Sequence, residues 1–257
     1  MHILLKINFF IKYIMLFILL SMYSAFAEEQ TITFEDGSTY KGNVVNDEME
    51  GKGLYKSAKD KAGRNLQYLG EFKGGKFNGE GQLDFYNGDI YIGGFEEGLM
   101  HGNGVLKYNN GAVYSGIFNK GNKAGKGKLV YADGVIYEGD FNNDKIEGLG
   151  KIIYELGNEY KGEFLNNLMH GKGTITFKDG SSYKGFFMDG QYNGLGMFTF
   201  ADGTYYEGEF KNGYRDGPGE LVYIDKTKQS GNFKNGNFIG EVITTFPDGT
   251  IQKQKAK

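Results

Sequence analysis

The feature that most constrains this chain is an internal period of 23 residues. At each step along the repeat, glycine stands two residues after a tyrosine, and phenylalanine stands four residues after it. A chain that copies a short unit folds as a stack of similar units, each burying its apolar side against its neighbours. We call these tyrosines and phenylalanines the aromatic ladder: Tyr68, Phe72, Tyr91, Phe95, Tyr114, Phe118, Tyr137, Phe141, Tyr160, Phe164, Tyr183, Phe187, Tyr206 and Phe210.

Each unit contains two segments with strand periodicity. In Tyr-x-Gly-x-Phe the named residues alternate with a period of two, so they share one face of a strand. The second segment, such as Gly79 to Phe85, alternates in the same way, and we expect both of its glycines to lie on the face of the rings. Glu97-Gly98 and Asp133-Gly134 illustrate the two turn positions, where positive φ values are needed. Each unit is therefore predicted to be a β-hairpin.

The composition supports a β architecture. The 257 residues include 43 Gly, 21 Phe and 19 Tyr, but only 2 Pro and no Trp or Cys. Collagen is excluded, because it needs glycine at every third position and abundant proline. The aromatic content argues against simple disorder, since disordered chains are poor in aromatic residues. We predict an all-β fold: an elongated repeat array of about nine antiparallel β-hairpins of 23 residues, which form a twisted single sheet.

The first 27 residues have the anatomy of a secretory signal peptide. Lys6 and Lys12 precede or flank an apolar run at residues 14–20, and Ala25-Phe26-Ala27 is a typical cleavage pattern. We therefore predict an exported protein, periplasmic or extracellular, with residues 28–251 as the repeat array and 252–257 as a short basic tail. Retention of the N-terminal segment as a membrane anchor is the alternative.

The repeat resembles the MORN repeat family (membrane occupation and recognition nexus). Its unit is close to Y-x-G-x-F-x-x-G-x-x-x-G-x-G, and the segment from Tyr91 to Gly104 follows this pattern throughout. The resemblance implies consecutive antiparallel hairpins and a role in scaffolding, protein–protein contact or membrane association. Enzymes of the family carry a separate catalytic domain, for which too few residues remain here. Val44 in place of Phe, Gln229 in place of Tyr and Lys226 in place of a turn Gly make the terminal units irregular.

No motif for catalysis, metal binding or cofactor binding is expected. His101 and His170 occupy the same repeat position three units apart, so they are not expected to share a metal. Gly-x-Gly pairs such as Gly171-Lys172-Gly173 recur within strands and not before a helix, which argues against phosphate loops. The repeated aspartates precede turn glycines, and turn formation explains them. A hydrolase or carbohydrate-active enzyme is therefore the weakest hypothesis.

An insertion interrupts the first complete unit. The unit that begins at Tyr40 is five residues longer than the others, and residues 56–65 carry Lys56, Lys59, Lys61 and Arg64 against one acidic residue. Two interpretations remain open: a solvated loop, or a contact site for an anionic partner or lipid head group.

The sequence thus predicts a non-enzymatic scaffold or protein-interaction module that is exported from the cytoplasm. The alternative is a peripheral membrane protein that binds anionic lipid. The expected partners are an unidentified protein, a second copy that pairs through unpaired edge strands, or an anionic membrane. With 29 Lys+Arg against 32 Asp+Glu, no broad basic surface for nucleic acid is expected.

Overall fold

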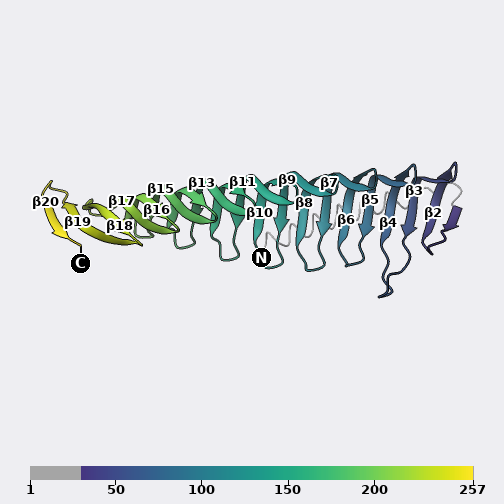
Figure 1. The fold of residues 1–257 in the computed structure, drawn as a ribbon, viewed down its shortest axis with the longest axis horizontal. Helices are drawn as coiled ribbons and strands as arrows, with labels where there is room; N and C mark the ends of the chain where they lie inside the picture. Colours follow the sequence, from purple (N-terminus) through teal and green to yellow (C-terminus); the bar gives the residue numbers. More distant parts are fainter. Residues whose placement is uncertain (1–29, 257) are drawn as a thin grey trace. The chain divides into compact units, whose positions relative to one another are not determined.

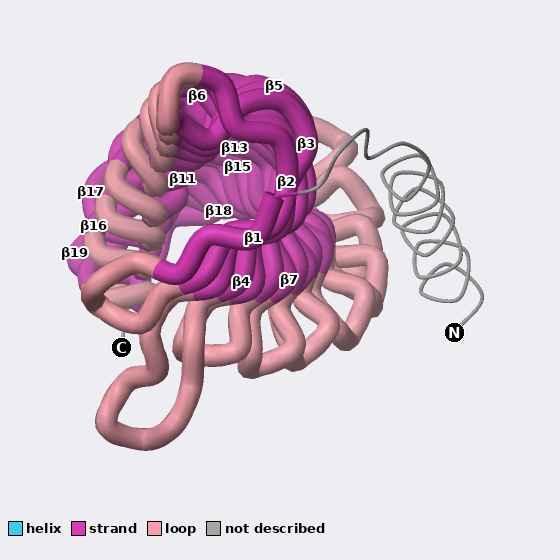
Figure 2. Tube along the Cα trace, turned by 90° about the vertical axis from the view of Figure 1, so that its right-hand side faces the viewer, coloured by secondary structure: helices cyan, strands magenta, loops and turns pink. Residues whose placement is uncertain are grey.

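The computed structural model describes residues 30–256, so the predicted signal peptide at residues 1–27 lies outside the described residues. The chain divides into two units, residues 1–124 and 125–257, which we describe separately. Within the described part every regular element is a β-strand, and all twenty strands belong to an antiparallel sheet. Figure 2 shows the strands in magenta alternating with loops in pink. The predicted all-β array of antiparallel hairpins is confirmed.

The first unit contains strands that follow one another in space as they do in sequence (Figure 1). They are β1 (Gln30–Thr33), β2 (Thr39–Val45), β3 (Glu48–Lys56), β4 (Gln67–Lys73), β5 (Lys76–Asp84), β6 (Ile90–Glu96), β7 (Leu99–Lys107) and β8 (Val113–Asn119). The boundary between the units falls within β9 (Asn122–Val130).

The second unit continues the same order of antiparallel neighbours from β9 onward. Its further strands are β10 (Ile136–Asn142), β11 (Lys145–Ile153), β12 (Glu159–Leu165), β13 (Leu168–Thr176), β14 (Ser182–Met188), β15 (Gln191–Thr199), β16 (Tyr205–Lys211), β17 (Tyr214–Val222), β18 (Lys228–Lys234), β19 (Asn237–Thr245) and β20 (Ile251–Lys255).

The lengths of four segments account for the period of 23. A strand of 7 residues, β6, is followed by the pair Glu97-Gly98, and β7 has 9 residues. The connection at residues 108–112 then leads into β8. The copies keep these lengths apart from the longer connection between β3 and β4, so equivalent side chains return to the same face of the sheet.

The tight turn inside each hairpin has positive φ at both of its residues. Glu97 and Gly98 have φ of 51° and 84°, as a type I′ turn requires. Asn166 and Asn167 adopt 50° and 70° without any glycine. Asparagine tolerates this region better than most residues, which explains why it replaces glycine here.

Most connections between hairpins are turns stabilised by an aspartate or asparagine side chain. In the copy at Asp179, the amide of Phe177 donates to the carbonyl of Ser181, and Gly180 has φ of 90°. The Asp179 carboxylate accepts hydrogen bonds from the Ser181 amide at 2.9 Å and from its hydroxyl at 2.6 Å. These bonds favour the ionised carboxylate and lower the pKa of Asp179. The aspartates therefore serve the turns, as the sequence indicated.

Each ladder tyrosine lies flat over two facing glycines. Gly162 pairs with Gly173 across β12 and β13, and the Tyr160 ring covers both. A Cβ on Gly173 would lie 2.5 Å from the Tyr160 ring, closer than real Cβ contacts. These positions therefore require glycine because of the ring above them.

The other repeated glycine of the second strand has a different role from the one we predicted. Gly171 has φ of 55°, and the register of β12 against β13 shifts between Gly162 and Glu163. The expectation that both glycines share the ring face is thus wrong for this position, which belongs to a β-bulge. The bulge directs the Glu163 carbonyl at the Tyr160 hydroxyl, which donates to it at 2.8 Å.

The rings form a continuous core within each unit. Tyr160 packs edge to face against Phe164 of its own hairpin, with ring centroids 5.1 Å apart, and against Phe187 of the next hairpin at 4.9 Å. Such T-shaped pairs stabilise a core beyond the area they bury. In another copy the open face of Tyr183 is covered by Tyr192, stacked at 3.8 Å. Arg215 takes the equivalent place over Tyr206, with its guanidinium carbon 5.4 Å from the ring centroid.

Both ends of the described chain add a strand beyond the expected repeats. β1 precedes the first predicted unit and pairs with β2. The predicted basic tail, residues 252–257, begins within β20, which pairs with β19 and has every residue exposed. The C-terminal residues therefore extend the sheet, although their side chains are solvated as expected.

Candidate interaction surfaces

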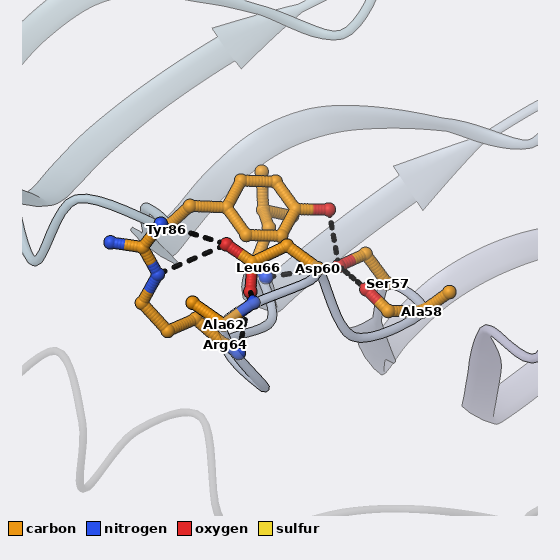
Figure 3. Close-up of polar contacts among 7 residues, drawn as sticks. All are labelled: Ser57, Ala58, Asp60, Ala62, Arg64, Leu66 and Tyr86. Atoms are coloured by element: carbon orange, nitrogen blue, oxygen red, sulfur yellow. Dashed lines mark hydrogen bonds and ion pairs between the residues drawn. The ribbon is translucent and has the colours of Figure 1, made fainter.

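The insertion forms an ordered loop between β3 and β4. Its base is closed where the Ser57 amide donates to the Leu66 carbonyl at 3.0 Å and the Leu66 amide donates back to Ser57 Oγ at 2.9 Å (Figure 3). Tyr86, from the next connection, donates to the same Oγ at 2.6 Å. In Figure 1 this loop reaches further than the neighbouring turns of its unit. The loop is thus held by its base while its tip projects into solvent.

A second group of bonds shapes the tip of the loop. The Asp60 carboxylate accepts hydrogen bonds from the amides of Ala62 and Arg64 at 2.8 and 2.9 Å, and it forms an ion pair with the Arg64 guanidinium at 2.9 Å (Figure 3). These interactions, chiefly the backbone hydrogen bond from Arg64, lower the pKa of Asp60. Arg64 is therefore partly neutralised within the loop.

The four predicted contact residues are placed differently. Lys59 and Lys61 are exposed at the tip, and Lys56 is half-buried as the last residue of β3. Within residues 30–256 none of these three lysines has an ion-pair partner. Arg64 is exposed but paired with Asp60. The loop thus offers two free cations at its tip, fewer than the four that the sequence suggested.

The aromatic ladder is an interior element and not a surface. Its seven tyrosines are each 0% exposed, and its phenylalanines are 5% exposed or less. Burial raises the pKa of Tyr206 to about 12, since the anionic phenolate loses hydration. The ladder rings are therefore not available to bind a partner, and any aromatic residues that do so must lie at other positions of the repeat.

A group of exposed apolar side chains on the opposite face was not predicted. Alternation along β14 shows the arrangement: Phe187 is 2% exposed, whereas Phe186 and Met188 on either side are 42% and 47% exposed. Similar residues point outward from neighbouring strands of the second unit. We call this group the outer patch: Leu165, Leu168, Phe186, Met188, Leu195, Met197 and Tyr214. Polar residues occupy many of these repeat positions in other copies. The change from polar to apolar residues in these copies is the sequence signal that could have indicated the outer patch.

Charged residues border the outer patch on two sides. Lysines lie toward β12–β14: Lys161, Lys172 and Lys184 are exposed, and the Lys172 ammonium stands 5.5 Å from the Phe186 ring centroid. Acidic residues lie toward β16 and β17: Glu207, Glu209 and Glu220. Exceptions to this separation include Glu159 and Glu163 on β12 and Lys211 on β16. The patch therefore has a basic margin and an acidic margin.

A shallow hollow of about 480 Å³ lies elsewhere in the second unit. Phe177, Phe198 and Leu156 supply its apolar lining, with Asn158 and Asp179 among its polar residues. Asp179 already serves its turn, and Asn158 Oδ1 accepts the Lys178 amide at 3.0 Å. Its polar groups are thus engaged in backbone structure, and no set of reactive groups converges there.

The two histidines of residues 30–256 lie in different units. His101 contacts Glu96 at 3.4 Å, and His170 belongs to β13 in the other unit. In this part of the chain no three His, Asp or Glu side chains gather as metal ligands would. Over the same residues, no helix has the length and apolar character to cross a bilayer.

Comparison with known families identifies the repeat. The MORN repeat profile matches eight segments, which together cover well over half of the chain: residues 40–60, 68–90, 91–113, 114–136, 137–158, 160–182, 183–205 and 206–228. The first match ends within the insertion. No curated protein is significantly similar to this chain.

Several solved structures share a distant likeness. The TCP10 domain of Danio rerio CPAP is 11% identical, with 88% of this chain and 94% of that chain covered and a TM-score of 0.44. The same domain in complex with a peptide of Danio rerio STIL is 14% identical, with 89% and 100% covered and a TM-score of 0.41. Virginiamycin B lyase from Staphylococcus aureus is 14% identical, with 89% and 74% covered and a TM-score of 0.17. Likenesses this weak support no conclusion about binding or catalysis.

Proposed function

We propose, because this chain belongs to the MORN repeat family, that it is a non-enzymatic scaffold which binds a protein partner. MORN repeats suggest interaction or membrane binding as the general role. The observation that favours a protein partner is the outer patch, in which Leu195 and Tyr214 are 65% and 60% exposed. Exposed apolar side chains gathered on neighbouring strands, with charged residues beside them, are typical of protein interfaces.

The interior of the fold supports a role without chemistry. The ladder rings cover one face of the sheet and are almost fully buried. Each ladder tyrosine hydroxyl donates a hydrogen bond to a backbone carbonyl, as Tyr160 does to Glu163. Catalysis in this fold would have to occur on an outer surface, where reactive groups are poorly shielded from water.

Site-specific photo-crosslinking in native cells tests the interaction role. A photoreactive phenylalanine analogue at Phe186 is expected to give a discrete crosslinked species, because this side chain lies within the patch. The same analogue at Tyr154, a half-buried position at a hairpin connection, serves as the control. Equal crosslinking at both positions, or none at Phe186, would count against the outer patch as an interface.

Binding to anionic lipid is the second candidate, and the insertion loop favours it. Lys59 and Lys61 project from an ordered loop and lack internal partners, so they are free to meet phosphate groups. Each basic residue near an anionic surface contributes roughly 1 kcal/mol of attraction, which added salt screens.

Vesicle sedimentation separates the two candidates. If lipid is the ligand, the chain pellets with vesicles containing phosphatidylserine at low salt, and the double change Lys59→Glu with Lys61→Glu abolishes pelleting. The matched control is Lys107→Glu with Lys120→Glu, which alters the net charge equally at two exposed sites of the same unit. Glutamate already occupies the equivalent of Lys120 at Glu97, so the turn tolerates it. No pelleting of the unchanged chain at low salt removes the lipid candidate.

Export belongs to the same proposal and rests on the sequence of residues 1–27. The cleavage pattern Ala25-Phe26-Ala27 leads us to propose a processed form that begins at Glu28. N-terminal sequencing of the protein recovered from separate cell fractions tests it. An intact N-terminus in the membrane fraction would instead support the anchor alternative.

A further inference from the structure

The outer patch is too concentrated to be ordinary surface. Its seven large apolar side chains come from β12, β13, β14, β15 and β17, and each is at least 36% exposed. Single exposed apolar residues are common on soluble proteins, but contiguous groups mark a surface that another molecule covers. The covering molecule must fit both the apolar centre and the two charged margins.

The strand registers arrange this face in rows. Lys172 on β13 is in register with Phe186 on β14, and Leu195 on β15 is in register with Glu209 on β16. Phe186 and Leu195 lie on adjoining strands at the bulge that interrupts the β14–β15 register between Gly185 and Phe187. Across these four strands the order is basic, aromatic, aliphatic, acidic. A second row runs in register from Lys161 through Thr174, Lys184 and Met197 to Glu207 and Glu220. Both rows change from basic to acidic on crossing the boundary between β14 and β15.

We propose that a second copy of this chain covers the outer patch, related by a two-fold axis that runs parallel to the strands between β14 and β15. Rotation about this axis places each strand opposite the partner strand that lies at the same distance on the other side of the axis. Because the axis is parallel to the strands, the rotation does not shift residues along them, so each residue faces a residue of the same row. A two-fold interface uses the same surface on both copies, so that surface must be complementary to itself. The inference rests on the proposed interaction role and names the partner.

The contacts that this axis produces are complementary. It sets β14 against the partner's β15, and it places Phe186 against the partner's Leu195. In the same row it places Lys172 against the partner's Glu209, and in the second row Lys161 against the partner's Glu220. Near the hairpin turns, Leu165 faces the partner's Tyr214. At the centre, apolar Phe186 thus meets apolar Leu195 in the first row, while in the second row the aliphatic stem of Lys184 lies against the partner's Met197. Opposite charges meet at the margins.

Charge complementarity favours a second copy over the other occupants. Lys172 and Glu209 have no ion-pair partner within residues 30–256, so both are available across an interface. An anionic membrane would attract the basic margin but would be repelled by Glu207 and Glu209 on the same face. An unrelated protein would have to carry acidic residues opposite the basic margin and basic residues opposite the acidic margin. A second copy of this chain, turned about the two-fold axis, has that arrangement.

Sedimentation equilibrium of the purified full chain over a range of concentrations tests the proposal. The unchanged chain is expected to form a dimer, and Leu195→Asp is expected to weaken dimerisation at least tenfold, because it would bury an unpaired carboxylate at the centre. Leu149→Asp is the matched control, since Leu149 is 61% exposed on the same face but lies outside the patch. Circular dichroism checks that both variants keep their strands.

A charge exchange tests the axis itself. Lys172→Glu alone is expected to weaken the dimer, because it places two carboxylates together at each margin. The double change Lys172→Glu with Glu209→Lys restores opposite charges across the two-fold axis and is expected to recover dimerisation. Lys172 and Glu209 lie on β13 and β16, three strands apart, so contact within one copy cannot account for such recovery.

Three results would overturn the proposal: a monomer at all concentrations, a dimer that Leu195→Asp leaves unchanged, or no recovery in the double variant. Failure of the proposed function gives a different combination of results. If the chain is monomeric but the Phe186 crosslink to another protein persists, the scaffold role stands and the second copy is wrong. If neither a dimer nor a crosslink forms, both are wrong.

Discussion

The hydroxyl of Tyr160 donates a hydrogen bond to the backbone carbonyl of Glu163, three residues further along the chain, at 2.8 Å. The same bond recurs in the other copies at 2.8 to 3.0 Å, for example from Tyr91 to Gly94 and from Tyr206 to Glu209. In each copy the acceptor lies where a bulge begins, so the bond joins the ring to the local shape of the strand. This relationship explains why tyrosine, and not phenylalanine, holds the first position of the repeat.

Removal of the Tyr160 hydroxyl is expected to destabilise the protein by about 1–3 kcal/mol, since a buried acceptor loses its donor. The variant is Tyr160→Phe, and urea unfolding measured by circular dichroism reports the change. Tyr154→Phe is the control, because Tyr154 is only half-buried and its hydroxyl makes no hydrogen bond within residues 30–256. Equal losses in the two variants would contradict a special role for the Tyr160 bond.

Glycine beneath a ladder ring is expected to be much harder to replace than glycine without one. In Gly185→Ala the new Cβ would lie 2.7 Å from the Cα of Gly196 and against the Tyr183 hydroxyl, which predicts a loss of roughly 3 kcal/mol or more. Gly231 occupies the same repeat position, but Gln229 stands in place of tyrosine, and its nearest neighbours would be 3.1 Å away. Thermal unfolding of both alanine variants tests the difference, and a Gly231→Ala loss as large as that of Gly185→Ala would refute it.

The protein is expected to lose stability in alkali. Burial raises the pKa of Tyr40 and Tyr206 to about 12, and it raises the pKa of Tyr68 and Tyr160 as well. An unfolded tyrosine ionises near pH 10. Between about pH 10 and 12 the unfolded chain therefore releases protons that the folded chain keeps, so the free energy of unfolding falls as pH rises.

Urea unfolding at a series of pH values measures this dependence, with tyrosinate absorbance recorded in parallel. The urea midpoint is expected to stay level up to about pH 9 and to fall above about pH 10. Tyrosinate absorbance of the buried rings should rise together with unfolding. A level midpoint through about pH 11 would show that the ladder is not buried in this way.

Loss of the Ser57 hydroxyl is expected to loosen the insertion loop without unfolding the sheet. In Ser57→Ala, the Leu66 amide and the Tyr86 hydroxyl both lose their acceptor. If the closed loop is destabilised by about 1 kcal/mol, the population of the open loop rises roughly fivefold. The rate of trypsin cleavage after Lys59 and Lys61 is expected to rise by the same factor. Ser182→Ala, in a regular strand of the other unit, is the control. Unchanged cleavage would show that other contacts hold the loop.

Local pattern predicted most of the repeat. Tyr91, Gly93 and Phe95 share one face because strand side chains alternate, and Asn166-Asn167 forms a hairpin turn because of its own backbone preference. Such features depend on a few adjacent residues, so they can be read from sequence. The fold class and the family followed from their repetition.

Other features depended on contacts that adjacent residues do not reveal. Gly171 was mistaken for a ring-facing position, because only the register of β12 against β13 shows that Gly171 and Lys172 have no partner on β12. The sequence counted Arg64 among four positive charges against one acidic residue, and only the fold of the loop shows that Arg64 is the one paired with Asp60. The outer patch escaped notice because its members, such as Leu165 and Tyr214, lie in different hairpins.

The sequence by itself determined the hairpin, its length and its turns, since these arise from alternation, glycine placement and a period that keeps every copy in step. Only the tertiary structure decided which outward side chains lie together. Neighbours in a sheet are set by hydrogen-bond register between strands, and register brings Lys172 beside Phe186 and Leu195 beside Glu209 although these residues are about fourteen positions apart in the chain.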